Sequence, residues 1–144
     1  AHGVLVTCHL DPHTVHTVLG DDGYPYGVPI NYFYDKERGS IYFHSAKVGH
    51  KVDAMEADNR VCFTVFEKEG EPTEDWSYYV NSVICFGRAV EMEGAEKERA
   101  ARLFGGRYFP TAEELETEMG EPFTRVRMTE IKIEHMSGKH VHEK

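Results

Sequence analysis

The residues best suited to chemistry lie in one stretch, Phe-His-Ser-Ala-Lys-Val-Gly-His-Lys, at positions 43–51. Its pattern predicts a short strand that leads into a helix over residues 46–57, with Ser45 as the N-cap. Free backbone N–H groups and the helix dipole favour an anion at such a helix start. Lys47 and Lys51 are four residues apart, so on a helix they would share one face. This spacing indicates a phosphate site; the alternative is a capped surface helix with solvated lysines.

Two further segments carry groups that could bind a ligand. Residues 26–32 read Tyr-Gly-Val-Pro-Ile-Asn-Tyr, which predicts an irregular strand because proline cannot donate to a strand ladder. Exposed backbone groups there and the Asn31 amide could hydrogen-bond a planar heterocycle, and Tyr32 could flank its ring. Ser82, in the apolar stretch 81–87, could serve the same ligand. An edge strand with a cross-strand aromatic pair and an interior strand explain the two segments without a ligand.

The surrounding elements predict a mainly β protein. Strands are expected over residues 3–10, 26–34, 41–44, 60–67, 76–92 and 123–134, and helices over residues 46–57, 95–104 and 111–119. Turns are expected at residues 20–23 and 35–40, a bulge at Gly87, a helix end at Gly105 and Gly106, and a capping box from Thr111 to Glu114. Six strands at hairpin-like spacing favour an antiparallel β-barrel with peripheral helices.

Length and charge narrow the classes of function. The 144 residues predict a single domain, residues 1–144, whose last residues, about 137–144, form a tail. A net charge of -9, from 16 basic and 25 acidic side chains, argues against nucleic acid as the main partner. The sequence has no apolar run long enough to cross a membrane. Cys8, Cys62 and Cys85 are far apart, which predicts free thiols in a reducing cytoplasm rather than a zinc site.

In their order along the chain, these motifs resemble the nitroimidazole-resistance protein family, a branch of the pyridoxamine-phosphate-oxidase-like superfamily. The resemblance is carried by residues 22–32, 41–46, 49–51, 59–63, 82–89 and 137–139, and it covers residues 3 to about 139. It implies an FMN-binding split β-barrel that forms a homodimer with FMN at the subunit interface.

The resemblance also implies a set of cofactor-binding residues. The phosphate would lie on Ser45, Ala46 and Lys51, with Lys47, Gly49 and His50 beside it. The isoalloxazine ring would lie along Val28, Pro29, Ile30, Asn31 and Tyr32, with Ser82 and Val83 near the cofactor from this subunit or its partner. His44 falls where the family carries a histidine close to the flavin, so it is expected to contact substrate or donate a proton; a structural histidine at a strand end is the alternative.

The function expected from this resemblance is an FMN-dependent oxidoreductase that reduces small molecules, nitro-aromatic compounds among them. Residues 135–140 read His-Met-Ser-Gly-Lys-His and lack the arginine-bearing segment of pyridoxamine-phosphate oxidases, which disfavours vitamin B6 oxidation. Two alternatives stay open: a flavin- or haem-binding module without turnover, and a metal protein. The metal would be held by His9, His13 and His16 or by His140 and His142, although these histidines lack the carboxylate partners that usually orient metal ligands, so no metal is expected.

Overall fold

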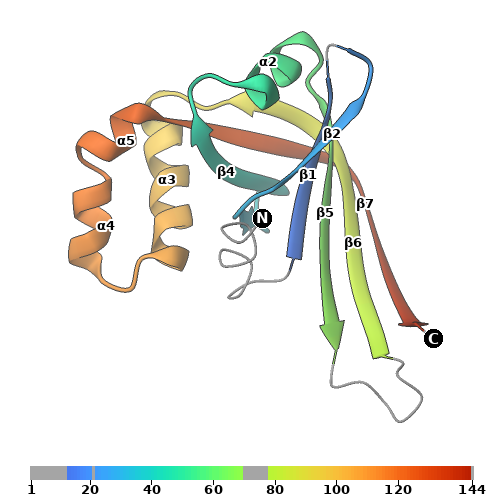
Figure 1. Cartoon of the computed structure of the whole chain (residues 1–144). Helices are drawn as coiled ribbons and strands as arrows, with labels where there is room; N and C mark the ends of the chain where they lie inside the picture. The colour runs from blue at the N-terminus through green and yellow to red at the C-terminus, as the bar shows by residue number, and fades with distance from the viewer. Residues whose placement is uncertain (1–12, 21, 70–77, 144) are drawn as a thin grey trace.

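The computed structural model describes residues 13–20, 22–69 and 78–143. Seven strands form one antiparallel sheet in the order β2-β1-β5-β6-β7-β4-β3 (Figure 1). The strands are β1 (His13–Leu19), β2 (Pro25–Pro29), β3 (Phe33–Asp35), β4 (Ser40–Ala46), β5 (Arg60–Glu69), β6 (Tyr78–Glu91) and β7 (Val126–Glu143). The described helices are α2 (His50–Ala57), α3 (Gly94–Tyr108), α4 (Ala112–Glu118) and α5 (Glu121–Arg125). The mainly β class predicted from the sequence is confirmed.

The two edge strands of the sheet are consecutive in the chain. β2 ends at Pro29 and β3 begins at Phe33, yet they occupy opposite ends of the strand order. The connection between them can reach at most about 14 Å, because an extended chain advances about 3.3–3.6 Å per residue. The sheet must therefore curl until its edges meet. The result is a barrel whose seam is closed by residues 30–32.

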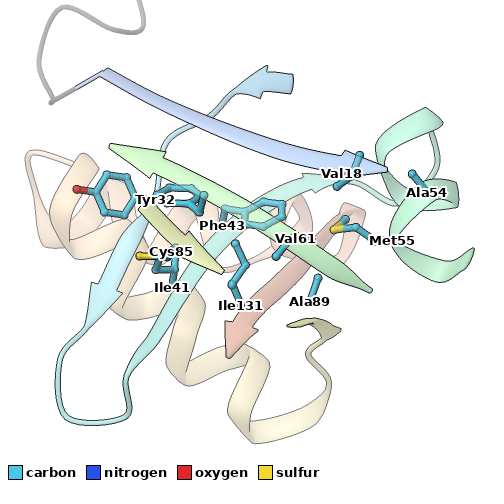
Figure 2. Close-up of a cluster of buried hydrophobic side chains, with 11 residues drawn as sticks. Val18, Tyr32, Ile41, Phe43, Ala54, Met55, Val61, Cys85, Ala89 and Ile131 are labelled. Atoms are coloured by element: carbon cyan, nitrogen blue, oxygen red, sulfur yellow. The ribbon is translucent and has the colours of Figure 1, made fainter. Parts of the chain in front are cut away.

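The main hydrophobic core fills the inside of this barrel (Figure 2). Because side chains alternate along a strand, Ile41 and Phe43 of β4 point inward, where they meet residues of the other strands such as Phe63 and Ile131. Ala54 and Met55 of α2 belong to the same cluster. Helix α2 thereby closes one end of the barrel.

β4 is buried on its outer face as well. There Tyr42 packs with Phe104 of α3 and Met128 of β7 in a second cluster. Burial on both faces explains why residues 41–43 are apolar or aromatic without a polar residue between them. Figure 1 shows α3, α4 and α5 grouped on this side of the sheet.

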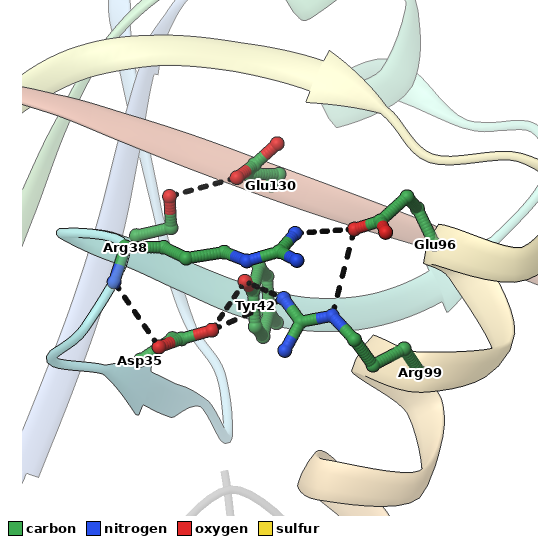
Figure 3. A network of polar contacts seen from close by, with 7 residues as sticks. Asp35, Arg38, Tyr42, Glu96, Arg99 and Glu130 are labelled. Carbon is green, nitrogen blue, oxygen red and sulfur yellow. Dashed lines mark hydrogen bonds and ion pairs between the residues drawn. The ribbon is translucent and has the colours of Figure 1, made fainter.

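A buried polar network fastens α3 to the β3–β4 hairpin (Figure 3). The Tyr42 hydroxyl donates to the Asp35 carboxylate at 2.7 Å, and the Arg99 guanidinium donates to Tyr42 at 2.7 Å and to Asp35 at 3.1 Å. Burial and the Asp35 hydrogen bond raise the pKa of Tyr42 to about 12. Burial alone would raise the pKa of Asp35, but the hydrogen bonds from Tyr42 and Arg99 lower it. The network therefore keeps Tyr42 neutral and Asp35 ionised at neutral pH, and α3 is held in a fixed position over β4.

Several short-range predictions are confirmed. The chain turns between β1 and β2, where the Gly23 N–H donates to the Gly20 carbonyl at 3.0 Å. The register of β6 with β7 shifts between Phe86 and Gly87, at the expected bulge. A Cβ at Gly87 would lie 2.3 Å from the Lys132 carbonyl oxygen, so a larger residue would collide with the neighbouring strand. The Thr111 hydroxyl caps α4 by accepting from the Glu114 N–H at 3.2 Å.

Other predictions of element boundaries are wrong. The strand expected over residues 26–34 is two strands, separated by the barrel seam. Helix α3 does not end at Gly105 and Gly106; it continues to Tyr108, whose ring packs 4.7 Å from that of Phe104 one turn earlier. Helix α5 was not predicted, and β7 begins at Val126.

The expected C-terminal tail is also wrong, because β7 pairs with β6 as far as Glu143. The strand expected over residues 3–10, with Cys8 in it, lies outside the described residues, and β1 was not predicted. In the described part of the chain, no helix has the length and apolar composition needed to cross a bilayer.

Among the residues that the structure describes, His16 of β1 is a buried polar side chain without a hydrogen-bond partner. Its ring is 0% exposed and lies 4.8 Å from the Phe43 ring, between centroids. Within the described residues, neither ring nitrogen has a hydrogen-bond partner. Burial, and to a lesser extent the charge of Lys51, lowers the pKa of His16 to about 4. The imidazole is therefore neutral in the folded protein at neutral pH.

This predicts a loss of stability in mild acid. The unfolded chain takes up a proton at His16 near the usual pKa of 6.5, whereas the folded chain takes it up only near about 4. The free energy of unfolding should therefore fall as the pH drops from about 6.5 towards 4, by up to a few kcal/mol. Urea unfolding of His16→Leu should show a smaller fall over this range, and the exposed control His135→Leu should behave as wild type. An unchanged pH dependence in His16→Leu would contradict this assignment.

Candidate functional site

Helix α2 begins later than the sequence predicts. Ser45 and Ala46 belong to β4, since pairing with β7 continues to Ala46 and Val126. The Ser45 hydroxyl donates to the Ala46 carbonyl at 2.9 Å, so it does not cap a helix. The helix starts at His50, and Lys47 lies in the bend before it. The predicted N-cap role of Ser45 and the shared helical face of Lys47 and Lys51 are therefore wrong.

The start of α2 is open to an acceptor from outside the helix. Its N-cap is Gly49, with a φ of 143° that favours glycine, and no side chain of the described residues caps the helix. The N–H groups of the first turn therefore lack a side-chain acceptor. Asp53 is the only acid in that turn, and it is exposed. Backbone donors and the helix dipole at this point favour an anionic group.

Lys51 adds a charge at the same place. Its side chain is half-buried, and its Nζ lies 5.4 Å above the centroid of the Phe43 ring. In the described part of the chain, no carboxylate pairs with this ammonium. Burial lowers the pKa of Lys51, as expected for a cation without a compensating anion. An unpaired, half-buried ammonium beside an uncapped helix start fits a phosphate group.

The charge of Lys51 lowers the pKa of two histidines, His16 and His44. His16 lies inside the barrel, and His44 lies on the outer face of β4, with its ring edge-on to Phe104 at 4.9 Å. Partial desolvation of the ring and the Lys51 charge lower the pKa of His44, although the residue as a whole is exposed, and Glu118 partly opposes this shift. Both imidazoles are thus mostly neutral at neutral pH. Of Lys51, His16 and His44, Lys51 is therefore the residue that carries a positive charge.

His50 connects the predicted phosphate segment to the predicted ring segment. Its ring lies edge-on to Tyr26 of β2, with centroids 4.7 Å apart. In the same strand, Val28 is half-buried and lies directly opposite His16 of β1. The structure therefore brings the start of α2 and the strand β2 together, as the cofactor prediction requires.

Tyr32, in the barrel seam, does not have the role expected for it. Its ring belongs to the main core, edge-on to Phe63 at 5.2 Å, so it does not face outward to flank a ligand ring. Ile30 also packs against the core, and its carbonyl accepts from the Thr14 hydroxyl. Of the five predicted ring contacts, Val28, Pro29, Ile30 and Asn31 stay at least partly accessible, and Tyr32 is buried.

Tyr108 holds this seam from outside the sheet. Its hydroxyl accepts from the Tyr32 N–H at 3.1 Å and donates to the Tyr32 carbonyl at 2.8 Å. A single side chain thus satisfies both backbone groups of a residue that has left the strand ladder. Sequence reasoning missed Tyr108; its only signal is the four-residue spacing from Phe104, which marks the buried face of α3.

Ser82 and Val83 lie away from these residues within one chain. Ser82 pairs with Phe66 of β5. Phe66 is six residues from Arg60, the end of β5 that follows α2, so about 20 Å of strand separates Phe66 from that end. Val83 packs against the main core, and Ser82 is on the opposite face of the sheet. The strand register therefore does not bring these two residues to α2.

A family model described as pyridoxamine 5'-phosphate oxidase matches residues 10–140. The chain belongs to this family. Comparison of the sequence with curated proteins found no match.

Solved structures agree with this fold. A candidate 5-nitroimidazole antibiotic resistance protein from Bacteroides thetaiotaomicron is 20% identical, with a TM-score of 0.73 over 98% of this chain and 84% of that one. A FAD-binding protein from Mesorhizobium loti is 21% identical, with a TM-score of 0.61 over 98% of this chain and 94% of that one. The flavocytochrome Anf3 from Azotobacter vinelandii is 20% identical, with a TM-score of 0.63 over 96% of this chain and 65% of that one. At these identities the likeness establishes the split-barrel fold.

In the described part of the chain, no three His, Cys, Asp or Glu side chains are grouped so that they could hold a metal ion. His9 lies outside the described residues, and His16 is buried in the core. His140 and His142 stack on the Tyr79 ring at 5.0 and 4.6 Å instead.

The role of Tyr108 in closing the seam can be tested by removing its hydroxyl. Tyr108→Phe keeps the ring against Phe104 but leaves the Tyr32 N–H and carbonyl without this partner. We expect a loss of about 1–3 kcal/mol in unfolding free energy and faster amide exchange at Tyr32. The exposed Tyr34 gives a matched control, Tyr34→Phe, which should change neither quantity. Equal behaviour of the two variants would mean that Tyr108 does not hold the seam.

Proposed function

We propose that this protein binds FMN and uses it to reduce small molecules, nitro-aromatic compounds among them, as a cytoplasmic homodimer. The observation that supports FMN most strongly is the half-buried Lys51 ammonium, which has no carboxylate partner in the described part of the chain and lies beside the uncapped start of α2. A phosphate monoester would supply the missing anion. Membership of the pyridoxamine 5'-phosphate oxidase family is consistent with a phosphate-bearing ligand.

The remaining contacts follow from the geometry around Lys51. The backbone N–H groups of the first turn of α2 would bind the phosphate together with the Lys51 ammonium. β2, joined to α2 through the Tyr26 and His50 rings, would provide the backbone of Val28 and Pro29 as one side of the flavin ring site. Ser45 and Lys47 are close in sequence to this site and would make secondary contacts.

When bound, FMN supplies hydride or electron transfer to the substrate. The protein then has to orient the substrate and supply a hydrogen bond. His44 is suited to that part, because its lowered pKa leaves a neutral imidazole with one N–H donor and one acceptor nitrogen. Only a small fraction of His44 is protonated at neutral pH, so hydrogen bonding to substrate is favoured over donation of a proton from this residue.

Replacement of Lys51 tests the phosphate site directly. Lys51→Met keeps the length of the side chain and removes its charge, so FMN should bind about 10–100-fold more weakly, which corresponds to the ~1.5–3 kcal/mol of a charged hydrogen bond. Riboflavin, which lacks the phosphate, should bind wild type and variant equally in the same flavin-fluorescence titration. The exposed control Lys36→Met should bind FMN as wild type does. Equal losses for FMN and riboflavin, or no loss, would contradict a phosphate contact at Lys51.

An exposed apolar face supports the homodimer. Ile84 and Phe86 of β6 are 37% and 51% exposed and point to the same side of the sheet as Ser82. Phe86 also lines a shallow groove of about 290 Å³ together with Leu19 and Cys62. Helix α2 packs mainly on β1, and α3 mainly on β3, β4 and β7, so this face of β6 lies away from the main helical packing. A second copy on this face would bury the apolar side chains and would also bring a partner residue to Ser82.

Sedimentation velocity tests this interface. Wild type should sediment as a dimer, and Phe86→Glu should sediment as a monomer because a carboxylate in the apolar interface would be costly to bury. Tyr34→Glu places the same charge on an exposed residue of β3 and should stay dimeric. A monomeric wild type, or a dimer unaffected by Phe86→Glu, would exclude this interface.

A flavin- or haem-binding module without turnover is the second candidate, supported by the likeness to a flavocytochrome. The two functions differ in turnover. Reduced flavin on the protein should be reoxidised by a nitro-aromatic compound faster than free reduced flavin if the protein is a reductase. Equal rates would favour the binding module.

A further inference from the structure

A hollow separate from the start of α2 lies on the outer side of β4. It is a half-open cavity of about 100 Å³ between β4, β7 and the helices α3, α4 and α5. Its wall is mainly apolar and includes Phe104, Phe109 and Phe123. His44 and Glu118 are the titratable side chains that line it.

The size of the cavity limits what can enter. A dry cavity of about 150 Å³ takes a benzene molecule. This space is smaller but half-open, so it has room for one ring at most, with the substituent and part of the ring in the mouth. The three fused rings of a flavin and the haem macrocycle are too large for it. Aromatic walls favour a flat ring, which can stack on or lie edge-on to phenylalanine.

The polar groups select the substituent. The His44 imidazole is edge-on to Phe104, so it is oriented by the cavity wall, and it offers one donor and one acceptor. Glu118 is close enough to His44 to act on its pKa, and its carboxylate is exposed at the mouth. Glu118 carries the only formal charge among the lining residues. Two ammonium groups outside the lining oppose it: Lys51, whose charge affects the pKa of His44 more than Glu118 does, and Lys97, whose Nζ lies 4.7 Å from the centroid of the Phe123 ring. Because these charges offset one another, a neutral polar substituent that can bond to the His44 donor and acceptor suits this mouth best.

We infer that this cavity binds a single planar ring with a neutral polar substituent, with the ring among Phe104, Phe109 and Phe123 and the substituent at His44 and Glu118. Binding itself needs no flavin. The further step, that the cavity is the substrate subsite of a reductase, rests on the proposed function and on the substrate contact proposed for His44, which lines this cavity.

Three molecules of nearly equal shape test the inference: benzamidine, benzamide and benzoate, which carry a positive, a neutral and a negative substituent. Each would be titrated into the flavin-free full-length protein, with NMR of the methionine methyl groups as the readout, since Met119 and Met128 line the cavity. We expect the neutral benzamide to bind in the millimolar range, with shifts at these two methyl groups, and the charged benzamidine and benzoate to bind more weakly. Shifts confined to other methionines, or no binding of any of the three, would overturn the inference.

Two variants locate the binding. Ala101→Leu fills part of the cavity from α3 and should abolish binding of benzamide. Because this buried substitution can disturb packing, Glu118→Gln at the exposed mouth provides an independent test. It should weaken the binding of benzamidine relative to that of benzamide by up to about fivefold, the size of an exposed ion pair. Benzamidine and benzamide affinities that are unchanged in both variants would place the binding elsewhere and overturn the inference.

FMN retention measured on the same samples separates this inference from the proposed function. Binding of the probes without FMN retention would support the cavity and contradict the flavin proposal. FMN retention without probe binding would leave the flavin proposal standing and overturn the cavity inference alone.

Discussion

The short connection between β2 and β3 is the constraint on which the rest of the structure depends. Since these strands are the two edges of one sheet, three residues between them force the sheet to close. Closure of the sheet encloses the hydrophobic core, where Phe43 and Phe63 pack. It also leaves backbone groups at the seam that need a hydrogen-bond partner. Tyr108 supplies that partner from α3, and the Asp35, Tyr42 and Arg99 network holds α3 against β4. The helical side of the molecule is thus part of the barrel's closure.

The closed barrel also places Lys51 near His16 and His44 in a protein that is acidic overall. The chain has a net charge of -9, yet Lys51 is half-buried without a carboxylate partner in the described residues, near two imidazoles whose pKa values its charge lowers. Neutral histidines around one ammonium keep the local charge low enough for the fold to tolerate it. An anion at the start of α2 would compensate this charge and would also accept from the first helical N–H groups. Stability and ligand binding are therefore coupled at Lys51.

Features set by short-range sequence could be predicted, and those set by pairing across the sheet could not. The turn at residues 20–23, the bulge at Gly87 and the Thr111 cap each depend on a few adjacent residues, and all three are confirmed. The start of α2 was misjudged because Ser45 is a good N-cap by type, but β7 extends β4 past it. The tail was misjudged because residues 137–143 are polar and become a strand only through β6.

The candidate site follows the same division. Lys51 and His50 were found from their place in one contiguous basic segment, and His44 from the resemblance to the family. Tyr32 was expected to face a ligand, because its type and position suggest a stacking ring, yet closure of the barrel turns it into the core. Tyr108 and the cavity under α3 to α5 depend on the docking of segments more than fifty residues apart, which no local pattern records.

We propose that the start of α2 and strand β2 form an FMN site. The most direct measurement is the visible absorption spectrum of the purified protein after incubation with FMN and removal of unbound flavin on a desalting column. We expect flavin bands to stay with the protein at about one FMN per chain, the stoichiometry of a single phosphate site. A protein that emerges colourless from the column would contradict it, because an unpaired Lys51 beside an uncapped helix would then not constitute a flavin-phosphate site.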